Sequence, residues 1–120
     1  MTTDTTHETP VDPADLPSTI RAFLAAHVAG EGAAAARAFT PDAVITDQGE
    51  TFRGTEQVLD FLRHAGSEFT YTTELVSARR EDDAHWAVVN RIEGDFPGNV
   101  ADLTYRFTLA VDLIRELTIT

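Results

Sequence analysis

The segment LTYRFTLAV, residues 103–111, decides the fold class of this 120-residue chain. From Leu103 to Val111 every second residue is large and apolar, and this period of two predicts a β-strand with one buried face. Similar alternation predicts strands over residues 69–78 and 84–93, and a last strand passes through Leu117 and Ile119. Only short turn segments separate these strands, so they are expected to form an antiparallel meander.

Helical spacing dominates the part of the chain before these strands. Apolar residues within 20–28 recur every three or four positions and predict a first helix, and an Ala-rich stretch up to Phe39 predicts a second one. Short strands are expected at residues 43–47 and 50–53, with Gln48-Gly49 as the turn between them. Thr55 then caps a third predicted helix, which Gly66 closes.

The order of elements predicts an α+β fold, because helices come first and strands last. A twisted antiparallel sheet with one apolar face needs a cover, and the N-terminal helices supply it. We therefore expect a curved antiparallel sheet wrapped around these helices as a cone. Residues 1–15 are polar and rich in Thr, Asp and Pro, which predicts a disordered tail, and residues 16–120 form the single domain.

Charge and composition exclude several classes of protein. The net charge of −11 argues against nucleic acid and anionic membranes as partners, since both require a basic surface. The chain has no cysteine, and no two histidines have metal-ligand spacing, so neither a metal site nor a cofactor is expected. The first ten residues do not resemble a signal peptide, and a cytoplasmic location is the prediction.

Two segments carry a resemblance to a known superfamily. AFTPDAVITDQGETFRGTEQVLDFLRHA spans residues 38–65, and RIEGDFPG followed by LTYRFTL lies within residues 91–109. In these segments the chain resembles the nuclear-transport-factor-2-like superfamily, which includes SnoaL-like polyketide cyclases and ketosteroid isomerases. The resemblance implies a cystatin-like α+β barrel, a cone-shaped pocket between sheet and helices, and commonly a homodimer.

Asp47 is the leading candidate for a catalytic residue. Strand alternation places it on the same side as Ala43 and Ile45, so it faces the pocket if Ile45 does. By its place in the motif it resembles the general base of ketosteroid isomerases. A carboxylate in an apolar pocket has a raised pKa, which suits proton transfer. The alternative is that Asp47 only forms the turn with Gln48-Gly49.

His27 and Tyr105 are the other catalytic candidates. His27 lies on the apolar face of the first helix and can meet Asp47 as an acid–base pair, or it can be a helix-end histidine bonded to a carbonyl group. Ketosteroid isomerases place an oxyanion-binding tyrosine where this chain has Phe23, and a second acid near Leu103 and Tyr105. Tyr105 can therefore substitute as the hydrogen-bond donor.

The predicted ligand is a small hydrophobic organic molecule, and two functions remain open. One is a cofactor-free acid/base enzyme of the isomerase, cyclase, dehydratase or epoxide hydrolase type. The other is a non-catalytic ligand-binding or dimerisation module of the same fold. A homodimer is expected because Val76, Ala78, Ala87 and Val89 give the second face of the sheet an apolar character. The residues expected to line the pocket are Phe23, Ile45, Phe61, Tyr71, Trp86, Phe96, Leu103 and Phe107.

Overall fold

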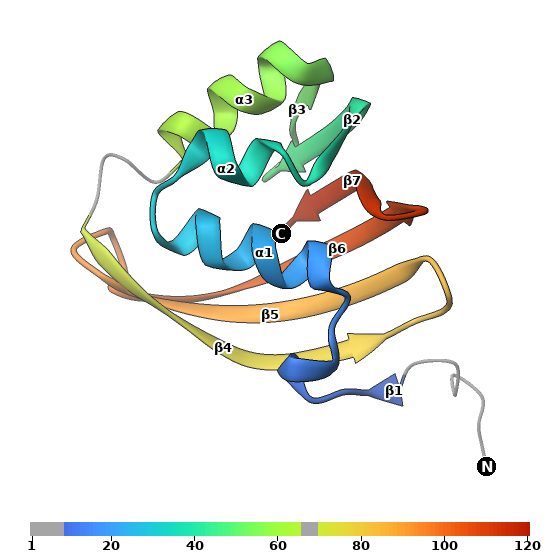
Figure 1. The fold of residues 1–120 in the computed structure, drawn as a ribbon. Coiled ribbons are helices and arrows are strands. Elements are labelled where there is room, and N and C mark those ends of the chain that lie inside the picture. The colour runs from blue at the N-terminus through green and yellow to red at the C-terminus, as the bar shows by residue number, and fades with distance from the viewer. Residues whose placement is uncertain (1–8, 66–69) are drawn as a thin grey trace.

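The computed structural model describes residues 9–65 and 70–120, which form one open sheet with helices on a single face (Figure 1). The helices are α1 (Ser18–Val28), α2 (Gly32–Ala36) and α3 (Gly54–His64), and a short 3-10 helix spans Pro13–Asp15. The strands are β1 (Thr9–Pro10), β2 (Phe39–Asp47), β3 (Glu50–Arg53), β4 (Tyr71–Arg80), β5 (His85–Gly94), β6 (Val100–Ala110) and β7 (Leu113–Ile119). The predicted α+β class is confirmed.

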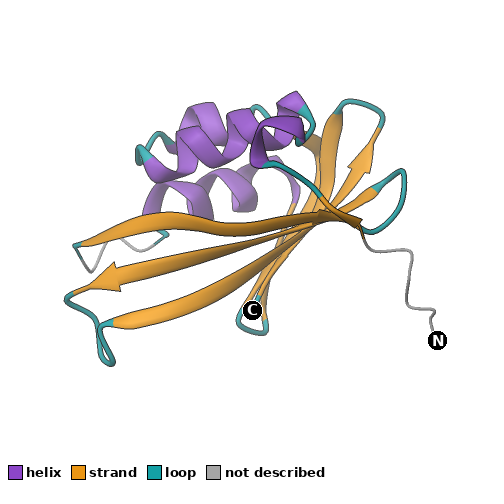
Figure 2. Cartoon of the chain, turned by 90° about the horizontal axis from the view of Figure 1, so that it is seen from below, coloured by secondary structure: helices purple, strands orange, loops and turns teal. Residues whose placement is uncertain are grey.

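The strands are hydrogen-bonded in the order β1-β4-β5-β6-β7-β2-β3. The predicted meander is present as β4 to β7, with antiparallel neighbours throughout. The sheet is not wholly antiparallel as expected, because β2 runs parallel to β7. No hairpin joins these two strands, so no turn in the sequence reveals their relative direction. Figure 2 shows the resulting twisted sheet curving beneath the three helices.

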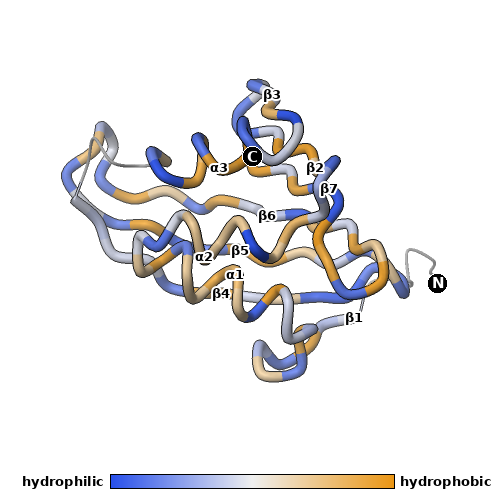
Figure 3. The backbone as a smooth tube through the Cα atoms, turned by 45° about the horizontal axis from the view of Figure 1, so that its top comes forward, coloured by the Kyte–Doolittle hydropathy of each residue, from blue (hydrophilic) through white to orange (hydrophobic). Residues whose placement is uncertain are grey.

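The core lies between α1 and the middle of the sheet. Ile20, Phe23 and Leu24 are buried on the sheet side of α1. The Phe23 ring meets Phe39 and Phe107 edge to face, with centroids 5.4 and 5.7 Å apart. Hydrophobic residues, orange in Figure 3, recur along α1 and along the strands that it faces. This apolar contact fixes where α1 crosses the sheet.

Strand β2 is longer than the five residues predicted for it. It begins at Phe39, and its pairing with β7 becomes irregular between Phe39 and Val44, which accommodates the exposed Pro41. Proline lacks the N–H that a regular ladder needs, so it occurs at such irregularities. The predicted turn is present: Gln48 and Gly49 both have positive φ, as a two-residue hairpin turn requires.

The expected N-terminal tail is corrected over residues 9–15. Thr9 and Pro10 pair with Arg79 and Arg80 at the edge of β4, and the Val11 N–H donates to the Ala78 carbonyl at 3.0 Å. Backbone pairing of this kind needs no apolar side chains, which explains why composition alone missed it. Residues 1–8 of the predicted tail, together with Gly66 and the start of the predicted strand at residue 69, lie outside the described residues.

Candidate functional site

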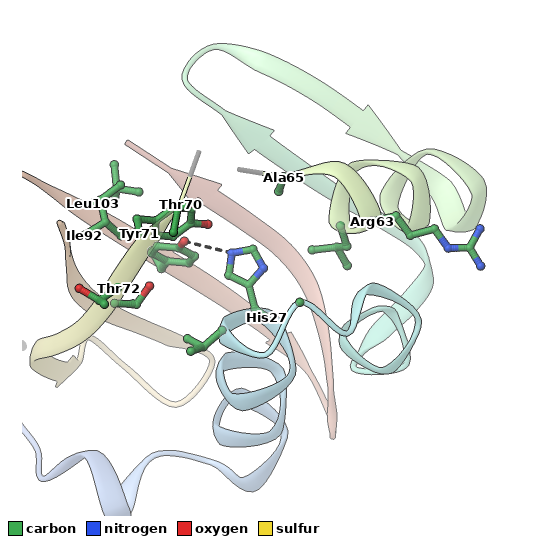
Figure 4. A pocket seen from close by; sticks show the side chains of 13 residues that line it. His27, Arg63, Ala65, Thr70, Tyr71, Thr72, Ile92 and Leu103 are labelled. Atoms are coloured by element: carbon green, nitrogen blue, oxygen red, sulfur yellow. Dashed lines mark hydrogen bonds between the residues drawn. The ribbon is translucent and has the colours of Figure 1, made fainter. Parts of the chain in front are cut away.

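Two adjacent hollows open on the concave face of the sheet beyond the C-terminal end of α1. Their volumes are about 740 and 450 Å³, and Figure 4 shows the larger one. Ligand pockets in proteins have volumes in this range. The residues that line both hollows are His27, Ala65, Tyr71, Ile92, Leu103 and Tyr105. We refer to the two hollows together as the cavity.

His27 lies in the last turn of α1 and forms part of the cavity wall. Its ring stacks on Phe23, with centroids 5.3 Å apart and the planes 12° from parallel. Its Nε2 atom lies 3.3 Å from the hydroxyl oxygen of Tyr105, and Figure 4 marks this hydrogen bond. Burial lowers the pKa of His27 below its ordinary value, so the neutral imidazole is favoured.

Tyr105 reaches the cavity from β6, which lies beneath α1. Only 5% of its surface is exposed. Burial raises the pKa of its hydroxyl far above the usual range, and the negative charge of Asp47 acts in the same direction. Tyr105 therefore remains a neutral phenol that can donate one hydrogen bond and accept others.

Asp47 lies at the end of β2 in the same lateral row of the sheet as Tyr105. Asp47 pairs with Ile119 on β7, and Ile119 pairs with Tyr105 on β6, so all three residues share one face. Asp47, His27 and Tyr105 together line the smaller hollow. The pKa of Asp47 is raised, first by burial and second by the charge of Glu50 directly across the hairpin. A carboxyl group in this setting takes up a proton more readily than an exposed one.

Comparison with known proteins identifies the family to which this chain belongs. The model of the SnoaL-like domain matches residues 20–116. The chain belongs to the SnoaL-like domain family. A search of curated protein sequences gives no match.

Solved structures support the same assignment of the fold. A protein from Sinorhizobium meliloti that carries the name "putative polyketide cyclase" is 28% identical, with a TM-score of 0.82 over 92% of this chain and 100% of that one. A protein from Catenulispora acidiphila with a ketosteroid isomerase-like fold, in complex with trimethylamine, is 17% identical, with a TM-score of 0.74 over 87% of this chain and 85% of that one. The predicted membership of the nuclear-transport-factor-2-like superfamily and the cystatin-like fold are confirmed.

In this SnoaL-like domain the predicted pocket residues divide into two groups. Phe61, Tyr71, Phe96 and Leu103 line the cavity. Phe23, Ile45 and Phe107 instead lie fully buried in the core, and Trp86 packs against that core. Phe23 belongs to α1, and the other three belong to strands of the sheet that α1 packs against. The helix layer and the sheet meet there without a gap, so side chains from both layers fill the core instead of lining a pocket.

Sequence analysis missed Asn90, Ala101 and Ile119 near the site. Ala101 and Ile119 line the smaller hollow, and Asn90 is buried beside Tyr105. A signal for Asn90 was present, since it interrupts the apolar alternation of β5 between Val88 and Ile92. A polar residue in the buried phase of a strand usually has a specific hydrogen-bond partner.

The described residues contain no group of three or more histidine and acidic side chains placed to hold a metal ion. Within the same residues, none of the helices is both long and apolar enough to cross a membrane. The titratable side chains that line the smaller hollow are those of Asp47, His27, Tyr71 and Tyr105.

Proposed function

We propose that the cavity binds a small hydrophobic organic molecule and that Asp47, His27 and Tyr105 carry out acid/base chemistry on it. The observation that supports this most directly is that all three side chains line one hollow of about 450 Å³. The rest of its lining is largely apolar and includes Phe61, Phe96 and Leu103. A few polar groups in an apolar hollow are typical of small-molecule sites.

The division of roles follows from the protonation states. Asp47 is the general base, because its raised pKa brings it closer to that of a carbon or hydroxyl acid in a substrate. Neutral His27 and the phenol of Tyr105 are hydrogen-bond donors and acceptors that can stabilise the charge formed on proton removal. Isomerisation, cyclisation, dehydration and epoxide opening all use such a set of groups.

The relatives support the two halves of this proposal to different degrees. The Sinorhizobium meliloti protein carries the name of a cyclase, which favours chemistry in this cavity. The Catenulispora acidiphila protein binds trimethylamine, which favours small-molecule binding by the fold. The alternative function is non-catalytic ligand binding or dimerisation, and it needs no titrating carboxyl in the cavity.

A hydrogen–deuterium exchange experiment tests the acid/base role. The probe is 2-tetralone, a bicyclic ketone with acidic C1 protons, in D₂O, followed by proton NMR. Asp47 removes a C1 proton, the electron pair moves to the carbonyl oxygen, and return of a deuteron from solvent labels the carbon. We expect the protein to accelerate exchange over buffer, and Asp47→Asn to abolish the acceleration because an amide does not accept the proton.

Glu50→Gln is the matched control for this experiment. Glu50 is an exposed carboxylate directly opposite Asp47 in the hairpin. It does not line either hollow, so its replacement removes one nearby charge and leaves the cavity wall unchanged. Acceleration should persist in Glu50→Gln at a lower rate, because the Glu50 charge is the smaller of the two causes that raise the pKa of Asp47. Binding of 2-tetralone without exchange would favour the non-catalytic module, and absence of binding would contradict the ligand site itself.

We also propose that the protein is a homodimer that associates through the outer face of the sheet. Val76 and Val100 are 45% and 49% exposed on the described surface. Ala78 does not belong to that face as predicted, because it pairs with Val88 and is buried in the core. Light scattering at micromolar concentration should return twice the monomer mass of 13.1 kDa, and a monomer mass would contradict the proposal.

The cytoplasmic location stays a prediction from the sequence.

A further inference from the structure

The Asp47 carboxyl has no opposite charge beside it in the part of the chain that the structure describes. It lies half-buried at the end of β2, and its side chain makes no hydrogen bond or ion pair with another described residue. The charged residue across the hairpin is Glu50, which repels it. A carboxylate withdrawn from water costs free energy unless a donor or an opposite charge compensates it, so this site favours a ligand that supplies one.

The wall of the smaller hollow does not supply that positive charge. Among the described residues that line it there is no arginine, and burial lowers the pKa of its one histidine, His27, which favours the neutral imidazole. Arg63 lines the larger hollow but not the smaller one, and in Figure 4 its guanidinium points away from His27. The net charge of the whole chain is −11, and a protein of this charge attracts cations. A cationic ligand therefore complements the smaller hollow.

Aromatic rings form much of the remaining wall of the smaller hollow. Phe61 comes from α3, Tyr71 from β4, Phe96 from the turn between β5 and β6, and Tyr105 from β6. The rings therefore border the hollow from the helix layer, from the sheet and from a turn. The face of an aromatic ring carries partial negative charge and attracts a cation that lies within about 6 Å of the ring centre.

The turn that carries Phe96 is held by its own hydrogen bonds. The Asn99 side-chain amide donates to the Gly94 carbonyl at 2.9 Å, and the Asn99 N–H donates to the Phe96 carbonyl at 3.0 Å. The Asp95 carboxylate accepts from the Thr70 N–H at 2.8 Å, which ties the turn to the residue before β4. Phe96 is thus part of a preformed wall, and a preformed wall lowers the cost of ordering the site when a ligand binds.

The groups around the hollow also select the kind of cation. Mg²⁺ and Ca²⁺ take about six or more oxygen ligands, and no cluster of three or more acidic or histidine side chains is placed to hold a metal ion within residues 9–65 and 70–120. A methylated ammonium ion carries its charge on an apolar surface, so it contacts aromatic rings and a carboxylate at the same time. The hollow of about 450 Å³ has room for such an ion.

We propose that the smaller hollow also binds small methylated ammonium ions, with the positive nitrogen beside the Asp47 carboxylate and the methyl groups against the aromatic rings. This ligand class uses the hollow of the proposed function but does not depend on Asp47 acting as a base. A bound ammonium ion occupies the space in which an acid/base substrate meets Asp47, so it inhibits that chemistry.

Binding is tested by calorimetric titration of the intact protein with choline and with 3,3-dimethyl-1-butanol. The two probes have the same shape, but a neutral carbon replaces the charged nitrogen of choline in the alcohol. We expect choline to bind at least roughly 10-fold more tightly, because only choline gains the attraction of the rings and of the carboxylate. Equal affinities, or tighter binding of the alcohol, would overturn the proposal.

Asp47→Asn and Glu50→Gln separate the direct ion pair from the general field of the protein. Each removes one negative charge, but only Asp47 lines the hollow. Asp47→Asn should weaken choline at least roughly 5-fold, and Glu50→Gln by less than about 2-fold, because exposed charges are screened by salt. Equal losses in the two variants would refute the contact between the ammonium ion and Asp47.

Phe96→Leu tests the aromatic wall without touching the core. Leucine keeps an apolar side chain at this half-buried position but removes the ring face. Choline affinity should fall roughly 2- to 5-fold, while the affinity for 3,3-dimethyl-1-butanol stays the same. An equal loss for both probes would show that Phe96 contributes only apolar surface, and would contradict the ring contact.

The exchange of 2-tetralone distinguishes failure of this proposal from failure of the acid/base proposal. Saturating choline should abolish the accelerated exchange, and exchange that continues unchanged would contradict a shared hollow. Accelerated exchange in a protein that does not bind choline would refute the ammonium site alone. Choline binding that depends on Asp47, in a protein without accelerated exchange, would support the ammonium site and refute the role of Asp47 as a base.

Discussion

Phe23 attaches α1 to the sheet, and its replacement by alanine measures how much of the stability depends on that contact. The ring is fully buried and packs edge to face against Phe39 and Phe107. Removing a core phenylalanine costs about 3–5 kcal/mol, from lost burial and from the void that remains. Domains of this size unfold at a total cost of about 5–15 kcal/mol, so Phe23→Ala should stay folded but lose a large part of its stability.

Phe23→Leu separates the aromatic contacts from the burial. Leucine keeps most of the apolar surface but loses two edge-to-face contacts, each worth about 0.5–1.5 kcal/mol. The expected loss is therefore about 1–3 kcal/mol, clearly smaller than that of Phe23→Ala. Both losses are read from urea denaturation followed by circular dichroism, with the slope of the transition checked for constancy.

Phe52→Leu is the control for these measurements. Phe52 lies on the edge strand β3, is only half-buried, and has one ring contact, with Phe61 at 4.7 Å. Its replacement should cost about 1 kcal/mol. The reasoning is refuted if Phe23→Ala costs less than Phe52→Leu, or if leucine at position 23 costs as much as alanine.

Two further predictions concern Asp47 and Val111. The folded-state pKa of Asp47 lies above its ordinary value of 3.8, so the ionised form of Asp47 opposes folding. This loss of folding free energy is absent below pH 3.8 and grows as the pH rises through the folded-state pKa. Asp47→Asn should therefore be more stable than the unmodified protein in thermal melts at neutral pH, with the difference vanishing on acidification; a less stable variant at pH 7 would contradict this. Val111 is 92% exposed and has a φ of 58°, a conformation that asparagine tolerates better than a β-branched residue. Val111→Asn should raise the free energy of unfolding by about 1 kcal/mol, whereas Val100→Asn, in strand β6, should lower it or leave it unchanged.

The elements of this fold could be predicted because each leaves a local pattern. Strand β6 was expected from its alternation, although it ends at Ala110 and not at Val111, since the chain turns there with positive φ. The parallel pairing of β2 with β7 leaves no such pattern, because it joins segments about 70 residues apart. Local rules therefore give the strands, while the closing of the sheet depends on how the whole chain packs.

The candidate site shows the same division. The side of β2 on which Asp47 lies follows from strand alternation alone, and Asp47 lines the smaller hollow. The contact of His27 with Tyr105 spans 78 positions in the sequence and depends on where α1 crosses the sheet. The depth at which Phe23 and Phe107 are covered depends on the same crossing, which is why both were assigned to the pocket.

The position of the cavity follows from the unequal lengths of α1 and the strands beneath it. Helix α1 has 11 residues and spans roughly 16 Å, whereas β6, also of 11 residues, spans roughly 36 Å. The helix therefore covers less than half of the strand, and the concave face beyond its last turn is left for α3 to cover in part.

His27 is in that last turn of α1, and Asp47 ends β2 at the same level as Tyr105. Polar groups at such a boundary are buried enough for their pKa values to change and still open to a ligand. Val28 is the last residue of α1 and lines the larger hollow, so Val28→Trp should fill space beyond the helix end and reduce the binding of 2-tetralone without weakening the core around Phe23. Unchanged binding in that variant would show that the end of α1 does not limit the cavity.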